Sequence, residues 1–254
     1  RINFPDEVAL GKALSKVIHT LPPVDVKINL PEIDLASVRS VINSTDDGFL
    51  SPEKVIQLLD AAQIPRAKER VASSSAEAVS ITGEFGFPVA MKVVGPVHKS
   101  DIGGVALNIN DTRSVEKEFA RMIKLPGVTG ILIQTMLKGT ELFAGVKYEP
   151  GFGSMIMCGL GGIFIEVIKD VQTGLSPLTL KEALDMIRNL KGYPILKGAR
   201  GKTPVYEMLF AEILVKLSVL ADLAPEIKEM DINPFMGTSE KIVAVDARVK
   251  ISKD

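Results

Sequence analysis

The sequence predicts an α+β fold, and three observations lead to this prediction. Residues 87–94 are rich in β-branched residues and residues 105–110 alternate between apolar and polar, as strands do. From residue 130 onward, several apolar stretches of strand length follow one another, often separated by glycine. Helical stretches with capping residues lie before, between and after these strands. The sum is a small mixed unit followed by a larger sheet with helices.

The first fifth of the chain contains one expected helix and one expected linker. Residues 1–20 place apolar side chains from Leu10 to Ile18 on one helical face. Residues 21–50 mix proline, aspartate and short apolar pairs, which is typical of a linker. These residues therefore look like the end of one unit and a bridge to the next.

Three helices are expected in the small mixed unit. Ser51, followed by proline, is a suitable N-cap for a helix that ends before Pro65. Ser74 and Glu77 have the spacing of a capping box and predict a second helix. Residues 113–124 predict the third.

The larger unit is expected to hold most of the strands. Thr179 and Glu182 have capping-box spacing for one helix, and residues 206–224 predict a long amphipathic helix. The expected strands of this unit are residues 130–137, 141–148, 154–160, 163–168, 229–235 and 241–249.

Composition excludes several classes of protein. The 254 residues include 30 basic and 31 acidic side chains, so no overall positive field attracts nucleic acid or an anionic membrane. The single cysteine, Cys158, excludes a disulfide framework or a cysteine-based zinc site and fits a reducing cytoplasm. The apolar runs are only strand-sized, so neither a membrane span nor a signal peptide is expected. Because the chain begins at Arg1, we expect it to be a piece of a longer polypeptide.

Two features of the small unit could contact phosphate. Lys92 stands in an otherwise apolar strand, where it could reach a nucleotide phosphate or lie on a solvated strand face. The segment from His98 to Asp101 precedes Gly103 and Gly104. Consecutive glycines let backbone N–H groups approach phosphate, and histidine can act as a nucleophile. The alternative is a polar hairpin that merely turns the chain.

Two features of the large unit could bind an anion or a cation. The segment "GLGGIFIEV" places glycines before Glu166 and could form a backbone anion site or a tight turn. Asp231 and Asn233 share a strand face, and a hairpin could bring Asn233 to Asp246. One carboxylate and one amide, completed by water and phosphates, suit Mg²⁺. The alternative is a set of ordinary turn residues, since Asn-Pro is common in turns.

Taken together, these motifs resemble a known family over about residues 51–251. The matching segments are "MKVV…VHKSDIGGV", "GTELFAGVKYEPGFG", "GLGGIFIEV", "KGARG" and "EMDINPF…AVDARV". They resemble the ATP-grasp part of the nucleoside-diphosphate-forming acyl-CoA synthetases, the group of ADP-forming acetate–CoA ligases. The β subunit of succinyl-CoA synthetase is a more distant relative. The resemblance implies an ATP-grasp fold of two subdomains, residues 51–129 and 130–254, with the nucleotide between them. Residues 1–50 would then be the tail of a preceding CoA-ligase half and a linker.

The resemblance also implies a mechanism and a set of residues. In the family, a phosphoryl group passes from an acyl phosphate through histidine to ADP, and His98 matches the histidine that relays it. The catalytic residues implied are His98, Lys99, Glu166 and Asp231. The nucleotide-binding residues implied are Lys92, Gly103, Gly104, Gln134, Met136, Leu137 and Glu141, with residues 134–137 as the hinge that meets adenine through its backbone. The Mg²⁺ ligands implied are Asn233 and Asp246.

The chain departs from the family pattern in two ways. Glu149 stands before Pro150 where aspartate is commoner, which leaves the role of that position open. The CoA-binding domains are absent, so the implied partners are CoA-ligase domains upstream or in an α subunit, which would bind CoA, and the full-length protein is expected to be an oligomer. Neither nucleic acid nor a membrane is an expected partner.

Two other functions remain open on sequence grounds. One is another ATP-grasp carboxylate ligase, which would not need His98. The other is a nucleotide-sensing module without catalysis, fused to an acetyltransferase. His98, Lys92, Asn233 and Asp246 are all present, and this favours the active synthetase half.

Overall fold

The computed structural model describes residues 4–18, 31–95, 102–162, 165, 169–198 and 203–253. Within them, the strands form two antiparallel sheets, and this confirms the α+β class. The larger sheet runs in spatial order through β1 (Gly48–Phe49), β11 (Ala247–Ile251), β9 (Ile227–Gly237), β6 (Thr140–Glu149), β7 (Gly153–Leu160) and β8 (Val171–Leu175), with β10 (Ile242–Ala244) paired to β9. The smaller sheet runs through β2 (Glu69–Ala72), β5 (Gly130–Thr135), β3 (Val89–Val94) and β4 (Val105–Ile109).

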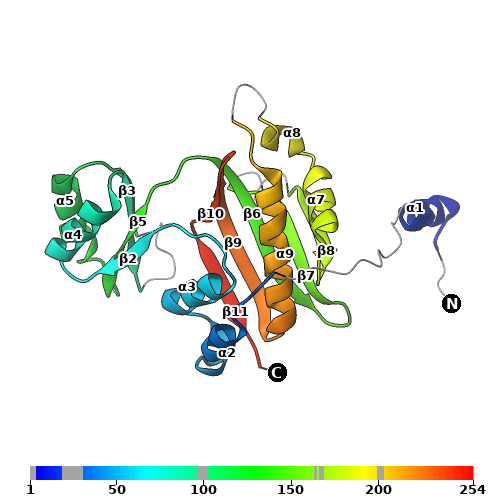
Figure 1. Ribbon diagram of the computed structural model, residues 1–254, viewed down its shortest axis with the longest axis horizontal. Helices are drawn as coiled ribbons and strands as arrows, with labels where there is room; N and C mark the ends of the chain where they lie inside the picture. Colours follow the sequence, from blue (N-terminus) through cyan, green and yellow to red (C-terminus); the bar gives the residue numbers. More distant parts are fainter. Residues whose placement is uncertain are drawn as a thin grey trace.

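Each sheet has helices on one face (Figure 1). The smaller sheet packs against α4 (Ser75–Phe85) and α5 (Thr112–Met122), and together they form a lobe beside the larger sheet. The helices over the larger sheet are α2 (Leu35–Asn43), α3 (Pro52–Ala61), α7 (Leu180–Arg188), α8 (Tyr193–Leu196) and α9 (Glu207–Leu223). Two separate apolar cores result, one under each set of helices.

The N-terminal part of the chain differs from the expected linker. Helix α1 (Glu7–Ile18) forms as predicted and has no buried residue. The linker prediction is wrong for residues 35–50, because α2 buries Val38, Val41 and Ile42 in the core of the larger sheet. Asp34 caps α2 by accepting a hydrogen bond from the Ser37 N–H at 3.1 Å. The short apolar pairs that looked like linker are therefore the buried face of a helix.

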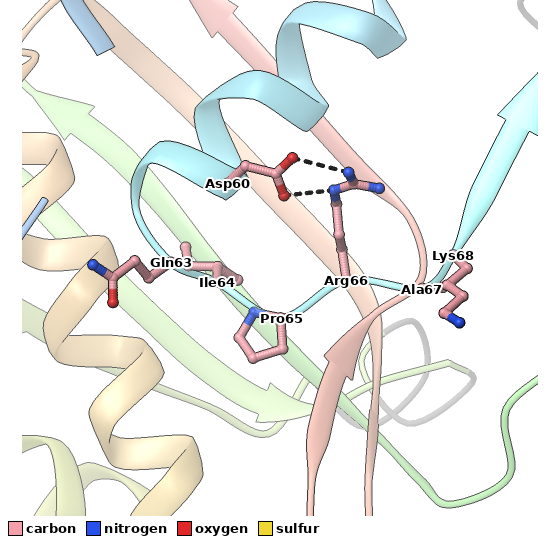
Figure 2. A pocket seen from close by; sticks show the side chains of 7 residues that line it. All are labelled: Asp60, Gln63, Ile64, Pro65, Arg66, Ala67 and Lys68. Atoms are coloured by element: carbon pink, nitrogen blue, oxygen red, sulfur yellow. Dashed lines mark hydrogen bonds and ion pairs between the residues drawn. The ribbon is translucent and has the colours of Figure 1, made fainter. Parts of the chain in front are cut away.

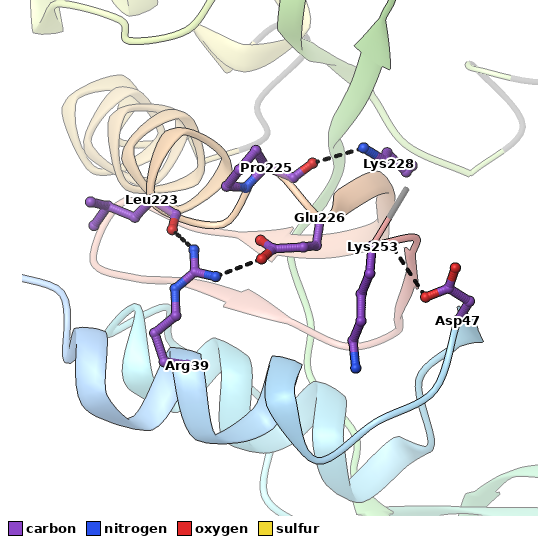
Figure 3. A network of polar contacts seen from close by, with 7 residues as sticks. All are labelled: Arg39, Asp47, Leu223, Pro225, Glu226, Lys228 and Lys253. Carbon is purple, nitrogen blue, oxygen red and sulfur yellow. Dashed lines mark hydrogen bonds and ion pairs between the residues drawn. The ribbon is translucent and has the colours of Figure 1, made fainter.

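Polar contacts tie α2 to the C-terminal end of α9 (Figure 3). Arg39 donates to the carboxylate of Glu226 at 2.7 Å and to the backbone carbonyl of Leu223. Asp47 accepts from the Lys253 N–H at 3.1 Å. Because these contacts join residues almost 200 positions apart, α2 belongs to the same folded unit as the C-terminal strands.

The two sheets also divide the chain at other residues than the expected subdomain boundary. Helix α3 buries Val55, Leu58 and Leu59 in the core of the larger sheet, although residues 51–61 were assigned to the small subdomain. Strand β5 was assigned to the large subdomain but lies in the smaller sheet, between β2 and β3. The smaller sheet with α4 and α5 is thus an insertion between α3 and β6.

The chain crosses between the two sheets twice, and both crossings run against β9 and β10. In the first crossing, Pro65 O accepts from the Ala244 N–H at 2.8 Å, and the Ala67 N–H donates to Ala244 O at 2.8 Å. In the second, Gly139 lies so close that an added Cβ would stand 2.5 Å from the Gly237 carbonyl oxygen. We call β9 and β10 with their turn, residues 227–244, the crossing hairpin.

Most predicted elements form, and a few differ. Strands β1, β2 and β8 and helix α8 were not predicted, and the predicted strand 163–168 lies outside the described residues apart from Ile165. Thr179 and Glu182 form the complete capping box that their spacing predicts. Ser74 caps α4 as expected, but the Glu77 carboxylate accepts from Ser73 rather than from Ser74. Among the described helices, none is long and apolar enough to cross a bilayer.

Candidate functional site

The smaller sheet presents a polar face away from its helices. Alternation along the strands places Val89, Met91 and Val93 in the core, so the neighbouring residues face the other way. We call this second face the open face of the smaller sheet, and it includes Glu69, Val71, Ala90, Lys92, Leu132 and Gln134. Lys92 is half-buried there. Its place supports a ligand-facing role rather than a fully solvated strand.

The glycines that follow the HKSD motif lie beside Lys92. The Gly104 carbonyl oxygen accepts from the Val93 N–H at 2.8 Å, so this backbone is bound to the strand that carries the lysine. Gly103 has a φ of +67°, which glycine adopts without strain. His98 and Lys99 lie outside the described residues, so their predicted roles stay predictions.

The four residues of the expected adenine hinge, 134–137, differ in their backbone hydrogen bonds. Gln134 lies inside β5, paired with Glu69 on one side and Ala90 on the other. The Met136 N–H already donates to Pro88 O at 3.2 Å. Leu137 follows the end of β5, and within the described chain no other backbone group accepts its N–H. Among residues 134–137, the Leu137 N–H is thus the one without a backbone acceptor in the described part of the chain.

The larger sheet brings the two predicted metal ligands together. Asn233 lies in β9, and its backbone N–H donates to the carbonyl oxygen of Asp246 at 3.1 Å. Asp246 lies between β10 and β11. The Asn-Pro pair is inside a strand, so the turn explanation is wrong and the predicted hairpin pairing is confirmed. Asp231 lies in the same strand and is exposed, between the buried Met230 and Ile232.

Two glycines let Glu141 and Asn233 approach the same backbone. The Gly161 N–H donates to Glu141 O at 2.8 Å, and the Gly162 N–H donates to the side-chain oxygen of Asn233 at 3.2 Å. A Cβ on Gly162 would stand only 1.8 Å from Glu141 Oε2. Within "GLGG", these two N–H groups therefore bind the protein and orient Asn233. Glu166 lies outside the described residues.

Acidic groups converge at Asp246. Partial burial raises the pKa of Asp231; Arg248 opposes this effect, while Asp246 and Glu229 add to it. Burial also raises the pKa of Glu69; Gln134, Lys92 and Arg66 oppose this effect, and Asp246 adds to it. Asp246 therefore acts electrostatically on Asp231 of the larger sheet and on Glu69 of the smaller one. A cation placed here would relieve both repulsions.

Glu69 is the residue that sequence reasoning missed. Gln134 is 2% exposed, and its side-chain nitrogen donates to Glu69 Oε2 and to Val245 O, each at 2.7 Å. The segment that contains Glu69, "ERVA", does not alternate between apolar and polar, so no strand was expected there. Only the pairing of Glu69 with Gln134 reveals its place on the open face.

A hollow of about 400 Å³ lies at the first crossing rather than at these residues. Figure 2 shows Asp60 of α3 holding the Arg66 guanidinium by two hydrogen bonds, at 2.7 and 2.9 Å. The hollow is lined by Asp60, Gln63, Ile64, Pro65, Arg66, Ala67 and Lys68. None of the predicted site residues lines this hollow.

The donor set suits a hard divalent cation. In the part of the chain that the structure describes, no group of three or more His, Cys, Asp or Glu side chains could hold a metal. Asn233 and Asp246 supply one amide and one carboxylate, both oxygen donors. Mg²⁺ is usually bound by one or two protein groups and completed by water and substrate phosphates. The residues present therefore fit Mg²⁺ bound together with a nucleotide.

Comparisons with known proteins agree with this geometry. The ATP-grasp domain family matches residues 40–251. The β subunit of acetate–CoA ligase [ADP-forming] I from Pyrococcus furiosus is 44% identical over 203 residues, which cover 76% of this chain and 88% of that protein. Acetate–CoA ligase [ADP-forming] I from Archaeoglobus fulgidus is 38% identical over 99% of this chain, which spans 39% of that longer protein.

Solved structures extend the likeness to three dimensions. The dinucleotide forming acetyl-coenzyme A synthetase 1 of Candidatus Korarchaeum cryptofilum has a TM-score of 0.78 and 34% identity, covering 85% of this chain and 100% of that one. One structure of that enzyme contains coenzyme A and Mg-AMPPCP, with its phosphohistidine segment pointing towards the nucleotide-binding site. PH1788 from Pyrococcus horikoshii has a TM-score of 0.76. The chain therefore belongs to the ATP-grasp family, among the β subunits and corresponding fused domains of the ADP-forming acetate–CoA ligases.

Proposed function

We propose that this chain is the nucleotide-binding half of an ADP-forming acyl-CoA synthetase and transfers a phosphoryl group between a histidine and ADP. One observation carries the proposal: the open face with Lys92 and the strands with Asn233 and Asp246 meet at the Gln134–Val245 contact. A cation on one sheet and oxygen donors on the other are what a magnesium nucleotide requires. The Mg-AMPPCP in the Korarchaeum relative supports the same ligands here.

The residues around the Gln134–Val245 contact bind different parts of the magnesium nucleotide in this proposal. Lys92 offsets phosphate charge from the smaller sheet, and Gly103 and Gly104 belong to the loop beside it. Leu137 offers a backbone donor to the adenine edge, and Glu141 faces the nucleotide from the start of β6. Asn233 and Asp246 would hold Mg²⁺, which supplies charge neutralisation and alignment of the phosphates when bound. Positioning and charge account for most of phosphoryl-transfer catalysis.

His98 is proposed as the phosphoryl acceptor. A neutral ring nitrogen attacks the γ-phosphorus of ATP, the bond from that phosphorus to the ADP oxygen breaks, and ADP leaves with the electron pair. The reverse step makes ATP. Lys99 offsets the charge of the transferred group, and Glu166 and Asp231 are proposed to lie near the phosphohistidine.

The remaining chemistry belongs to other domains. The acyl-CoA and its phosphate would react on CoA-binding domains, either upstream in the same polypeptide or in an α subunit, and we expect an oligomer of the whole enzyme. The chain spans 39% of the length of the Archaeoglobus relative, which supports the proposal that further domains carry out these steps. A protein with one cysteine, buried at Cys158, suits the reducing cytoplasm.

Labelling with γ-³²P-ATP and Mg²⁺ tests the proposal. We expect an acid-labile, base-stable label on the chain that disappears in His98→Ala and persists in His19→Ala, the matched control at the other histidine. Binding of Mg·ADP is measured by calorimetry on the same samples. Binding without label, also in the presence of the CoA-binding domains, would instead favour a nucleotide-sensing module. A label that persists in His98→Ala would contradict the relay.

A further inference from the structure

The side chain of Gln134 bridges three segments of the molecule. Its amide nitrogen donates one hydrogen to Glu69 of β2 and the other to the carbonyl oxygen of Val245, both at 2.7 Å. Both partners are acceptors, so the orientation of the amide is fixed by them and both of its hydrogens are used. The amide is almost fully buried, so losing either acceptor would leave a costly unpaired donor.

The bridge joins the two halves of the nucleotide site. Gln134 and Glu69 face each other across β5 and β2 on the same open face as Lys92. Val245 is the residue directly before Asp246, and its own N–H donates to Pro234 O at 3.0 Å. A shift of the Gln134 amide therefore moves the backbone that carries the metal-ligating carboxylate relative to the sheet that carries the lysine.

We propose that Glu69 is a positioning residue for the nucleotide site. It holds the Gln134 amide against Val245, and this fixes the distance between Lys92 and Asp246. The role rests on the proposed function, because it matters only if the two residues bind one magnesium nucleotide.

Charge and hydrogen bonding at Glu69 make different predictions, so the two can be separated. Lys92 and Arg66 are cations near Glu69, and Asp246 is a like charge. If Glu69 acted only as a counter-charge for the cations, an aspartate would serve and a glutamine would not. If Glu69 acts through the bridge, glutamine serves because its side-chain oxygen reaches equally far and accepts the same bond. Aspartate is one methylene shorter and leaves the Gln134 donor unpaired.

The experiment compares four chains by calorimetry of ADP binding over a series of Mg²⁺ concentrations: the wild type, Glu69→Gln, Glu69→Asp and the control Glu84→Gln. Glu84 is also a glutamate bound to β2, through Arg70, but it lies on the exposed helix side. We expect Glu69→Asp to weaken Mg·ADP binding and raise the Mg²⁺ requirement about tenfold, the usual effect of an unpaired buried donor. Glu69→Gln should stay within about twofold of the wild type and of the control.

Thermal unfolding of the same samples separates positioning from simple bracing. If Glu69 only stabilises the fold, Glu69→Asp should lower the unfolding temperature and leave the Mg²⁺ requirement unchanged. That result would overturn the proposal. Weak binding by Glu69→Gln with normal binding by Glu69→Asp would overturn it too, in favour of a counter-charge. If the wild type itself binds no Mg·ADP, also in the presence of the CoA-binding domains, the proposed function fails and the role of Glu69 falls with it.

Discussion

The two sheets are built alike on their covered faces and differ on their open ones. Under the helices, each sheet buries alternate apolar residues in a closed core. On the open faces, the smaller sheet presents Lys92 with an amide and one carboxylate, whereas the larger sheet presents Glu141, Asp231 and the Asn233–Asp246 pair. The covered face of each sheet thus stabilises the fold by apolar packing, whereas the open face carries the charged and polar side chains. Neither sheet alone holds both Lys92 and the two proposed metal ligands.

The largest expected effect comes from truncating a buried phenylalanine in either core. Phe235→Ala in the larger core and Phe119→Ala in the smaller core should each cost about 3–5 kcal/mol of unfolding free energy. Because the cores are separate, Phe119→Ala should remove hydrogen-exchange protection from β3 and β5 while β6 and β9 keep theirs. Hydrogen exchange read by mass spectrometry checks this. Equal loss of protection in both sheets would show that they unfold as one unit.

The next largest effect is expected at the proposed metal ligands of the larger sheet. Asp246→Asn should lower Mg²⁺-dependent phosphoryl transfer by about 100-fold, since even residues behind a metal ligand contribute 10–100-fold. The transfer rate is measured against Mg²⁺ concentration. Asp222→Asn on the exposed side of α9 is the control. A transfer rate unchanged by Asp246→Asn would remove this residue from the site.

The cation of the smaller sheet should matter somewhat less. Lys92→Met keeps the length of the side chain and removes its charge, so nucleotide affinity should fall about 10-fold, as expected for one lost charge-assisted hydrogen bond. Calorimetry with ADP checks this, with Lys68→Met on the exposed crossing as control. Equal effects of both lysine variants would mean that only overall charge attracts the nucleotide.

The smallest effect concerns the helix layer of the larger sheet. Arg188 donates to Glu207 at 2.6 Å and Tyr193 donates to it at 2.7 Å, and the bond from Arg188 is the main cause that lowers the pKa of Glu207 below its ordinary value of 4.5. This interaction stabilises the fold above about pH 4.5, and its contribution is lost as the pH falls through the lowered pKa.

Glu207→Gln should therefore reduce stability at pH 7 by about 0.2–1 kcal/mol, because solvent screens the pair, and should have no effect at pH 2. Urea unfolding at both pH values measures the difference, and Glu240→Gln in the exposed β9–β10 turn is the control. An equal loss at both pH values would mean that packing, and not charge, explains the effect.

Local patterns predicted most of the elements correctly. The capping residues at Ser51 and Thr179 start helices where expected. The strand around Lys92 and the Asn233–Asp246 pairing also follow from apolar content and spacing alone. These predictions succeed because each depends on residues close in sequence or on a simple hairpin.

The failures all depend on distant partners. Helix α2 was taken for linker because its apolar face is short, and its place is set by contacts with Leu223 and Glu226. Strand β5 was assigned to the wrong sheet because its apolar content does not say which strands it pairs with. Glu69 was missed because its partner, Gln134, lies 65 residues away. A single sequence contains no local pattern for such pairings.

The crossing hairpin contacts both connections between the lobes and also carries one of the two proposed metal ligands. The first crossing lies against Ala244 and the second against Gly237, and the same hairpin contains Asn233 and ends just before Asp246. The angle between the lobes and the spacing of the two proposed metal ligands are therefore coupled through one element. By thermodynamic reciprocity, if a bound nucleotide raises the affinity for the cation by drawing the lobes together, the cation raises the affinity for the nucleotide by the same factor.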